Sequence, residues 1–126
     1  MSASLDRKST FVHCFTQRGH LFAQVLSPNV GQREVPIIAA EVGDAITSLG
    51  DDAKGHHFVL DLGRVTALSS MGLGMCVDLR NRAAHAKMKA VLVGASGTLL
   101  ELLKLMKIDR QYQLVPDAAA LARLLG

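Results

Sequence analysis

A buried-strand pattern runs into a helical pattern through two adjacent serines, and this junction constrains the fold of the chain more than any other segment. The run at residues 57–62 has the apolar and β-branched composition of a strand, and Gly63 and Arg64 end it. Helical spacing of apolar residues begins just after Ser69 and Ser70. The two serines are therefore predicted to lie at a strand-to-helix connection.

A serine at such a connection has two interpretations. Its hydroxyl can accept a hydrogen bond from a free N–H group in the first helical turn, which makes it a structural cap. The same N–H groups would also tolerate a phosphate on the hydroxyl, so the serine can be a modification site that leaves the domain folded. The spacing of Ser69 and Ser70 alone does not choose between these interpretations.

Apolar periodicity elsewhere predicts strands that alternate with helices after an opening hairpin. The predicted strands are residues 10–17, 21–26, 57–62, 89–94 and 112–115, and the predicted helices end before Gly50 or follow Ser70, the candidate cap Ser96, and Pro116. This order favours an α/β fold, a mixed four- to five-stranded sheet faced by about four helices. With 126 residues, 49% of them hydrophobic, the chain suits one domain, which we place at 10–125 after an N-terminal tail at 1–9.

Several segments of the chain together resemble one family. Val59-Leu-Asp-Leu, followed by Val65-Thr-Ala-Leu-Ser-Ser-Met-Gly-Leu-Gly74, resembles the signature of STAS domains, the family of bacterial anti-sigma factor antagonists. Residues 88–94 resemble that family's next strand, and residues 99–110 resemble its helix with an apolar, aspartate, basic turn. The segment from Pro116 to Leu121 also fits. The resemblance covers residues 10–125 and implies a single STAS-like domain with the same mixed α/β architecture.

The resemblance is incomplete at the two serines. Many family members carry Asp-Ser-Ser or Asp-Ser-Thr before a glycine, and the first serine after the aspartate receives phosphate. Aligned on Gly72, Ser70 takes the phospho-acceptor position, Ser69 replaces the acidic residue and Met71 replaces the second hydroxyl. The resemblance therefore implies phosphorylation at Ser70, with Ser69 as the second candidate. It leaves open whether either is modified, because some family members lack a working phosphosite.

Leu73 and Val77 flank the apolar stripe of the helix that follows the serines. Apolar residues beside a regulatory site can belong to a partner-binding surface, and we predict such a surface from these two residues with Ser69, Ser70 and Met71. Partial burial against the core explains the same spacing, so both interpretations stay open.

The resemblance implies a regulatory binding protein that is not an enzyme. The first hypothesis is an anti-sigma factor antagonist-like protein that binds an anti-sigma factor with serine kinase activity. Phosphorylation of Ser70 would weaken that binding, and a phosphatase would restore it. The alternative is a STAS-type subunit of a membrane transport assembly without a working phosphosite. Met71 and the missing acidic residue at position 69 agree with the alternative.

Serine hydrolysis is not expected at Ser70. Part of the hydrolase nucleophile elbow, Gly-x-Ser-x-Gly, is present, but Leu68 stands where the first glycine is required. The histidine that follows Ser70 in the sequence, His85, lies about four turns along the same predicted helix, so it cannot easily reach back as a base.

Composition argues against nucleic acid, metal and membrane. Aromatic residues make up 4% of the chain, tryptophan is absent and the net charge of +3 is scattered, so we expect no nucleic acid partner. Adjacent strand residues such as His56 and His57 point to opposite faces, and we expect neither a metal nor a cofactor. No apolar run reaches the roughly 18 residues that a bilayer requires, so we expect no membrane insertion and a cytoplasmic location. Cys14 and Cys76 have no C-x-x-C spacing and are predicted to be buried free thiols.

Overall fold

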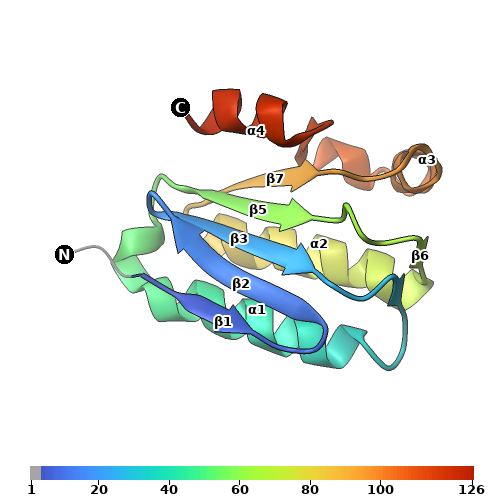
Figure 1. The fold of residues 1–126 in the computed structure, drawn as a ribbon, viewed down its shortest axis with the longest axis horizontal. Coiled ribbons are helices and arrows are strands. Elements are labelled where there is room, and N and C mark those ends of the chain that lie inside the picture. Colours follow the sequence, from blue (N-terminus) through green and yellow to red (C-terminus); the bar gives the residue numbers. More distant parts are fainter. Residues whose placement is uncertain (1–3) are drawn as a thin grey trace.

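A mixed six-stranded sheet organises the structure, a computed structural model that describes residues 4–126 (Figure 1). Across the sheet the strands follow the order β1 (Asp6–Lys8), β2 (Val12–Gln17), β3 (His20–Val25), β5 (His57–Asp61), β7 (Lys89–Val93) and β8 (Gln113–Val115). β1, β2 and β3 pair in antiparallel fashion, and the pairs from β3 to β8 are parallel. The predicted hairpin and the predicted mixed α/β sheet are confirmed.

Four α-helices lie within residues 4–126, as the sequence predicts. They are α1 (Val35–Leu49), α2 (Ser70–His85), α3 (Gly97–Leu105) and α4 (Ala118–Leu125), with short 3-10 helices η1 (Gly50–Ala53) and η2 (Ile108–Arg110). The side chains of Ser69, Ser96 and Asp117 accept hydrogen bonds from the first turns of α2, α3 and α4. Ser96 is thus the cap that the sequence indicates.

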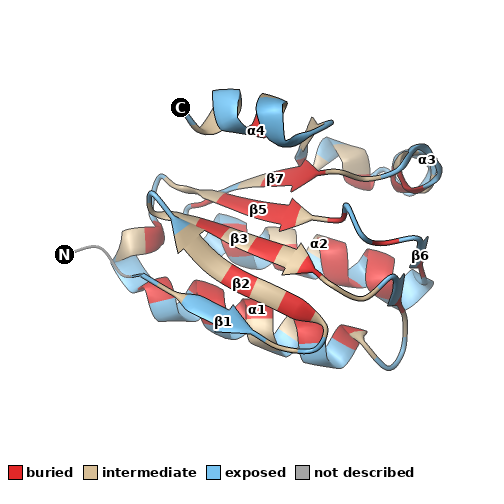
Figure 2. Ribbon diagram, viewed as in Figure 1, coloured by how far each residue is buried: buried red, intermediate tan, exposed pale blue. Residues whose placement is uncertain are grey.

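The core has two parts because the strands expose alternate side chains to the two faces of the sheet. On β5, Phe58 and Leu60 belong to the main core, which also contains the buried stripes of α1, α2 and α3. Val59 points to the other face, where it packs with Val91, Val93 and Leu121 of α4. Figure 2 shows the buried positions concentrated in the central strands and on the sheet-facing sides of the helices. Each face therefore has its own helical cover.

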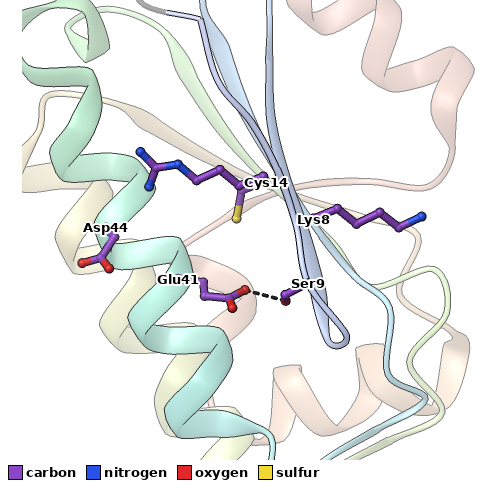
Figure 3. Close-up of a pocket in the computed structure, with 6 residues that line it drawn as sticks. Lys8, Ser9, Cys14, Glu41 and Asp44 are labelled. Carbon is purple, nitrogen blue, oxygen red and sulfur yellow. Dashed lines mark hydrogen bonds between the residues drawn. The ribbon is translucent and has the colours of Figure 1, made fainter.

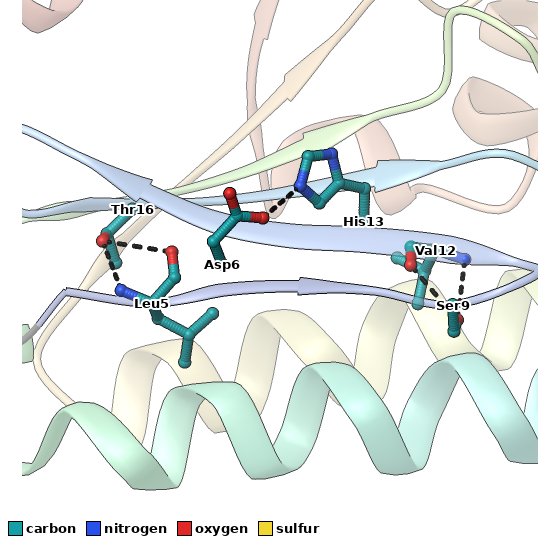
Figure 4. A network of polar contacts seen from close by, with 6 residues as sticks. All are labelled: Leu5, Asp6, Ser9, Val12, His13 and Thr16. Atoms are coloured by element: carbon teal, nitrogen blue, oxygen red, sulfur yellow. Dashed lines mark hydrogen bonds and ion pairs between the residues drawn. The ribbon is translucent and has the colours of Figure 1, made fainter.

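Strand β1 lies in the stretch that the sequence analysis assigned to the N-terminal tail, of which residues 1–3 are outside the described residues. Thr16 binds both backbone groups of Leu5: its Oγ1 accepts from the Leu5 N–H at 2.9 Å, and its N–H donates to the Leu5 carbonyl at 2.9 Å. His13 Nε2 lies 2.6 Å from Asp6 Oδ1 (Figure 4). Residues 6–8 are exposed and charged, so backbone pairing and these polar contacts hold β1 to the sheet.

Candidate functional site

A second, two-stranded sheet holds the serine junction in place. β4 (Asn29–Val30) pairs in parallel with β6 (Ala67–Leu68), directly before Ser69. The Pro28 carbonyl accepts hydrogen bonds from the N–H groups of residues 66 and 67, and the Val30 carbonyl accepts from the Ser69 N–H at 3.0 Å. The chain that leads into α2 is therefore fixed by backbone contacts to a segment almost 40 residues earlier.

Ser69 is the N-cap of α2. Its backbone is extended, with φ −76° and ψ 174°, and its Oγ accepts a hydrogen bond from the Gly72 N–H at 3.2 Å. Its carbonyl accepts from the Leu73 N–H at 2.9 Å and so opens the helical ladder. The structural interpretation of the serine pair thus applies to Ser69.

Gly72 allows the first turn of α2 to approach β4 and β6. A Cβ atom at this position would lie 2.9 Å from the Val30 carbonyl oxygen and 2.6 Å from Leu68 Cδ1. Both distances are shorter than real Cβ contacts, and the carbonyl belongs to a backbone that is fixed by pairing. The glycine after the serines is therefore required by packing in this fold.

Ser70 is the first residue of α2 and is exposed. Within residues 4–126 its hydroxyl makes no hydrogen bond, in contrast to the hydroxyl of Ser69. The first turn of α2 contains no acidic residue, so the positive end of the helix is not offset by a carboxylate of its own. The site thus offers a free hydroxyl beside N–H groups that favour an anion.

The other residues of the predicted partner surface divide into exposed and buried. Met71 is 46% exposed, and Ile37 near the start of the neighbouring helix α1 is 43% exposed at the same end of the molecule. Leu73 is only 6% exposed and belongs to the main core, while Val77 is partly buried against that core. Of the apolar side chains predicted for this surface, Met71 is the one that is openly presented.

A shallow pocket of about 280 Å³ lies beside the serine junction. Its lining residues are Asn29, Val30, Gly31, Glu34, Ala67, Leu68 and Ser69. Glu34 contributes the charged group of this lining, and its Oε1 accepts a hydrogen bond from the Gly31 N–H at 3.1 Å. The sequence analysis did not connect Glu34 with the serines, because only the parallel pairing of β4 with β6 brings the two segments together.

His85, the histidine that follows Ser70 in the sequence, is too far away to act as its base. His85 is the last residue of α2, which places it roughly 22 Å along the helix axis from Ser70 at about 1.5 Å per residue. Asp61, at the end of β5, accepts a hydrogen bond from the Gly63 N–H at 2.8 Å and so stabilises the turn before the junction.

A different pocket, of about 160 Å³, lies between β1, β2 and α1 (Figure 3). Glu41 Oε2 accepts a hydrogen bond of 2.5 Å from the Ser9 hydroxyl there, and the Cys14 thiol faces the same space. Burial, and next the Glu41 carboxylate, raise the pKa of Cys14 to about 11, a shift that favours the protonated and less reactive form of the thiol at neutral pH. Both cysteines are free and buried, as predicted.

The structure also bears on metal binding and on membrane insertion. In the part of the chain that the structure describes, no three His, Cys, Asp or Glu side chains are placed to hold one metal ion. None of the described helices combines the length and the apolar character that crossing a bilayer demands.

Solved structures with this fold include regulators and a transporter. An anti-sigma factor antagonist from Mycobacterium paratuberculosis aligns with a TM-score of 0.75 and 16% identity, over 90% of this chain and 92% of that chain. The phosphorylated form of the Bacillus cell fate determinant SpoIIAA aligns with a TM-score of 0.64 and 13% identity, over 97% and 99%. The murine Solute Carrier 26 family member A9 anion transporter aligns with a TM-score of 0.67 and 16% identity, over 85% of this chain and 18% of the transporter. At these identities the likeness concerns the fold.

No curated protein matches the sequence. The profile of the STAS domain family, in contrast, matches residues 34–120, which include α1, the serine junction and most of the parallel half of the sheet. This match extends over more than half of the sequence, and the fold agrees with it. The chain therefore belongs to the STAS domain family.

Proposed function

We propose that this STAS domain is a cytoplasmic regulatory protein that binds an anti-sigma factor with serine kinase activity, and that phosphorylation of Ser70 switches the binding. Membership of the STAS family and the likeness in fold to anti-sigma factor antagonists support this proposal. In this proposal the chain acts through binding and has no catalytic activity of its own. The regulated process is transcription.

The different roles of Ser69 and Ser70 carry the proposal. Ser69 uses its hydroxyl to cap α2, whereas the hydroxyl of Ser70 is exposed and unbonded within the described residues. A phosphate on Ser70 would leave the contact between Ser69 and Gly72 intact and would lie at the positive end of α2. Modification at Ser70 is therefore compatible with the folded domain, as a reversible switch requires.

Binding would be sensitive to that phosphate because of its surroundings. The exposed side chain of Met71 follows Ser70 directly, and the carboxylate of Glu34 lines the adjoining pocket with Ser69. Up to about two negative charges added beside Met71 and near a carboxylate would have to be desolvated when a partner covers the surface. Leu73, which is buried, and Val77 would support the surface from the core side.

The proposal is tested with wild type and three variants, Ser70→Ala, Ser70→Asp and Thr98→Asp. Thr98 is an exposed hydroxyl residue in the first turn of α3, so Thr98→Asp adds the same charge at a matched position away from the site. Each protein is used to capture partners from the lysate of its own cell, and retained proteins are tested for phosphoryl transfer to it. We expect a serine kinase that phosphorylates wild type but not Ser70→Ala, and that binds Ser70→Asp about tenfold or more weakly than wild type or Thr98→Asp.

A second function, a subunit of a membrane transport assembly, is favoured by two observations. Met71 replaces a hydroxyl residue of the family pattern, and the fold also matches part of an anion transporter. In that case the same membrane transport proteins would be retained by wild type and by Ser70→Asp. Equal binding of a kinase to both proteins, or phosphorylation that persists in Ser70→Ala, would count against the regulatory switch.

A further inference from the structure

Three histidines gather at the end of the sheet that lies opposite the serine junction. His20 begins β3, His57 begins β5, and His56 directly precedes β5. The ring centroid of His20 lies 5.3 Å from that of His56 and 5.1 Å from that of His57. We call these three residues the histidine cluster. In Figure 1 it belongs to the left end of the sheet, where the turn between β2 and β3 meets the start of β5, whereas β6 and the start of α2 lie at the right.

One contact in the cluster depends on a neutral imidazole. The backbone N–H of His57 donates a hydrogen bond to Nδ1 of His20 at 3.0 Å. An imidazole nitrogen accepts a hydrogen bond only when it carries no proton, so this contact requires Nδ1 of His20 to be unprotonated. It links the start of β3 directly to the start of β5, where parallel pairing of the two strands begins.

His57 itself is in an unfavourable place for a proton. Its Nδ1 is buried and has no hydrogen-bond partner within the described residues. A proton on this atom would create a buried donor without an acceptor, on a ring that then carries a full charge. Protonation of His57, like protonation of His20, would therefore destabilise the contact between the start of β3 and the start of β5.

The charged groups around the cluster are mostly basic. Arg18 lies in the turn before His20, and Lys89 of β7 pairs in register with His57. The contact of His56 Nδ1 at 2.8 Å is to a neutral group, the backbone carbonyl of Asp52 in η1. Arg18 Nη1 also donates to the carbonyl of Gly126 at 3.3 Å, which brings the end of the chain to this turn.

These surroundings lower the pKa of both His20 and His57. Burial, and next the charges of His57, His56 and Arg18, lower the pKa of His20 below its ordinary value of 6.5. Burial, Lys89 and His56 lower the pKa of His57 in the same way. His20 and His57 thus bind protons more readily when the chain is unfolded, or when the start of β3 has separated from the start of β5, than in the folded structure.

We propose that the histidine cluster is an acid-sensitive contact: protonation of His20 and His57 separates the turn between β2 and β3 from the start of β5. The stabilisation is fully present above the ordinary histidine pKa of 6.5 and is lost as the pH falls below it. Since the serine junction lies at the other end of the sheet, acid would loosen the hairpin without altering Ser69 or Ser70. This proposal is independent of the one for Ser70.

The test compares wild type with the double variant His20→Asn/His57→Gln and with the control His85→Gln. The amide oxygen of Asn can stand close to the place of Nδ1 and accept from residue 57, yet it does not titrate. His85 is exposed on α2 and lies outside the cluster. Between about pH 7.5 and 5.5 we expect the Tm of wild type and of His85→Gln to fall by at least about 3 °C more than the Tm of the double variant.

Titration of the imidazole resonances by NMR gives a second readout, and its first part uses wild type alone. In wild type, His20 and His57 should titrate below the ordinary histidine pKa of 6.5. In Lys89→Gln, which removes the ammonium opposite His57, the titration of His57 should move to higher pH. Titration of His20 and His57 at the ordinary histidine pKa of 6.5, an unshifted His57 in Lys89→Gln, or an unchanged loss of Tm in the double variant would overturn the proposal.

Discussion

At the scale of single residues, the function proposed for the junction depends on two hydroxyls that are one position apart. Ser69 Oγ satisfies the N–H of Gly72 and is part of the folded structure, whereas Ser70 Oγ is free of such contacts within residues 4–126. A modification enzyme that acts on a folded domain requires the second kind of hydroxyl. The arrangement therefore separates Ser69, which caps α2, from Ser70, the proposed phosphorylation site.

This separation predicts unequal effects of two alanine substitutions on stability. Ser69→Ala removes the cap of α2 and should lower the free energy of unfolding by about 1 kcal/mol. Ser70→Ala removes no hydrogen bond and should change it by less than about 0.5 kcal/mol. Urea denaturation of the two variants beside wild type measures both values. A larger loss of stability in Ser70→Ala than in Ser69→Ala would show that the cap of α2 is assigned to the wrong serine.

At the scale of elements, α4 is the helix that covers the second face of the sheet. Leu121 is its buried residue and packs with Val59, Val91 and Val93, and Asp117 caps the helix through the Ala120 N–H at 2.9 Å. The three valines come from β5 and β7, the strands at the centre of the parallel half of the sheet. Contacts through one leucine thus connect α4 to the strand that leads toward the serine junction.

We expect Leu121→Ala to lower the free energy of unfolding by about 2 kcal/mol or more, because it removes a large side chain from that cluster. Leu105→Ala is the matched control, since Leu105 is 77% exposed at the end of α3, and its effect should stay within about 0.5 kcal/mol. Denaturation in urea measures the free energy of unfolding of both variants beside wild type. Equal losses would mean that α4 does not contribute to the core as its contacts indicate.

The elements that the sequence predicts are those in which apolar residues follow a helical or strand pattern over many positions. Residues Ile38 to Leu49 repeat at helical spacing and form α1, and the apolar run before Gly63 forms β5. β1 has three charged residues and no alternation, so nothing local marks it as a strand. β4 and β6 have two residues each, too few to show an alternating apolar pattern. They form because the backbones of residues 28–30 and 66–69 pair with each other.

The candidate site, like the fold, was predictable where it depends on local sequence and not where it depends on tertiary contacts. The position of the serines at a strand-to-helix junction follows from the local pattern, and the structure agrees with it. Three details depend on tertiary contacts: the assignment of the cap to Ser69, the burial of Leu73 and the presence of Glu34 in the adjoining pocket. Helical spacing placed Leu73 beside the buried stripe, and the close approach of α2 to β4 at Gly72 accompanies its full burial.

At the scale of the whole molecule, the two thiols can distinguish partial opening from global unfolding. Cys14 in β2 and Cys76 in α2 are both buried in the main core. Burial raises the pKa of Cys76 to about 12, and burial with the Glu41 carboxylate raises the pKa of Cys14 to about 11. Because the thiolate is the reactive form, both should react slowly with a thiol reagent at pH 8 while the protein is folded.

The two thiols differ in how much structure must open before they react. Cys14 lines the pocket between β1 and α1, and β1 is a short, exposed edge strand, so its release should uncover Cys14. Cys76 is fully buried on the core-facing side of α2, and its carbonyl accepts a hydrogen bond from the buried Tyr112 hydroxyl at 2.6 Å. Exposure of Cys76 therefore requires disruption of the core itself.

We expect Cys14, measured in Cys76→Ala, to react faster without denaturant than Cys76, measured in Cys14→Ala. The rate for Cys76 should follow the free energy of global unfolding as urea is raised, and the rates should converge near the unfolding midpoint. Deletion of residues 1–8 should accelerate Cys14 much more than Cys76, because it removes β1 and leaves the contacts of α2 in place. Faster reaction of Cys76 than of Cys14 would show that α2, with the serine junction at its start, opens before the edge of the sheet.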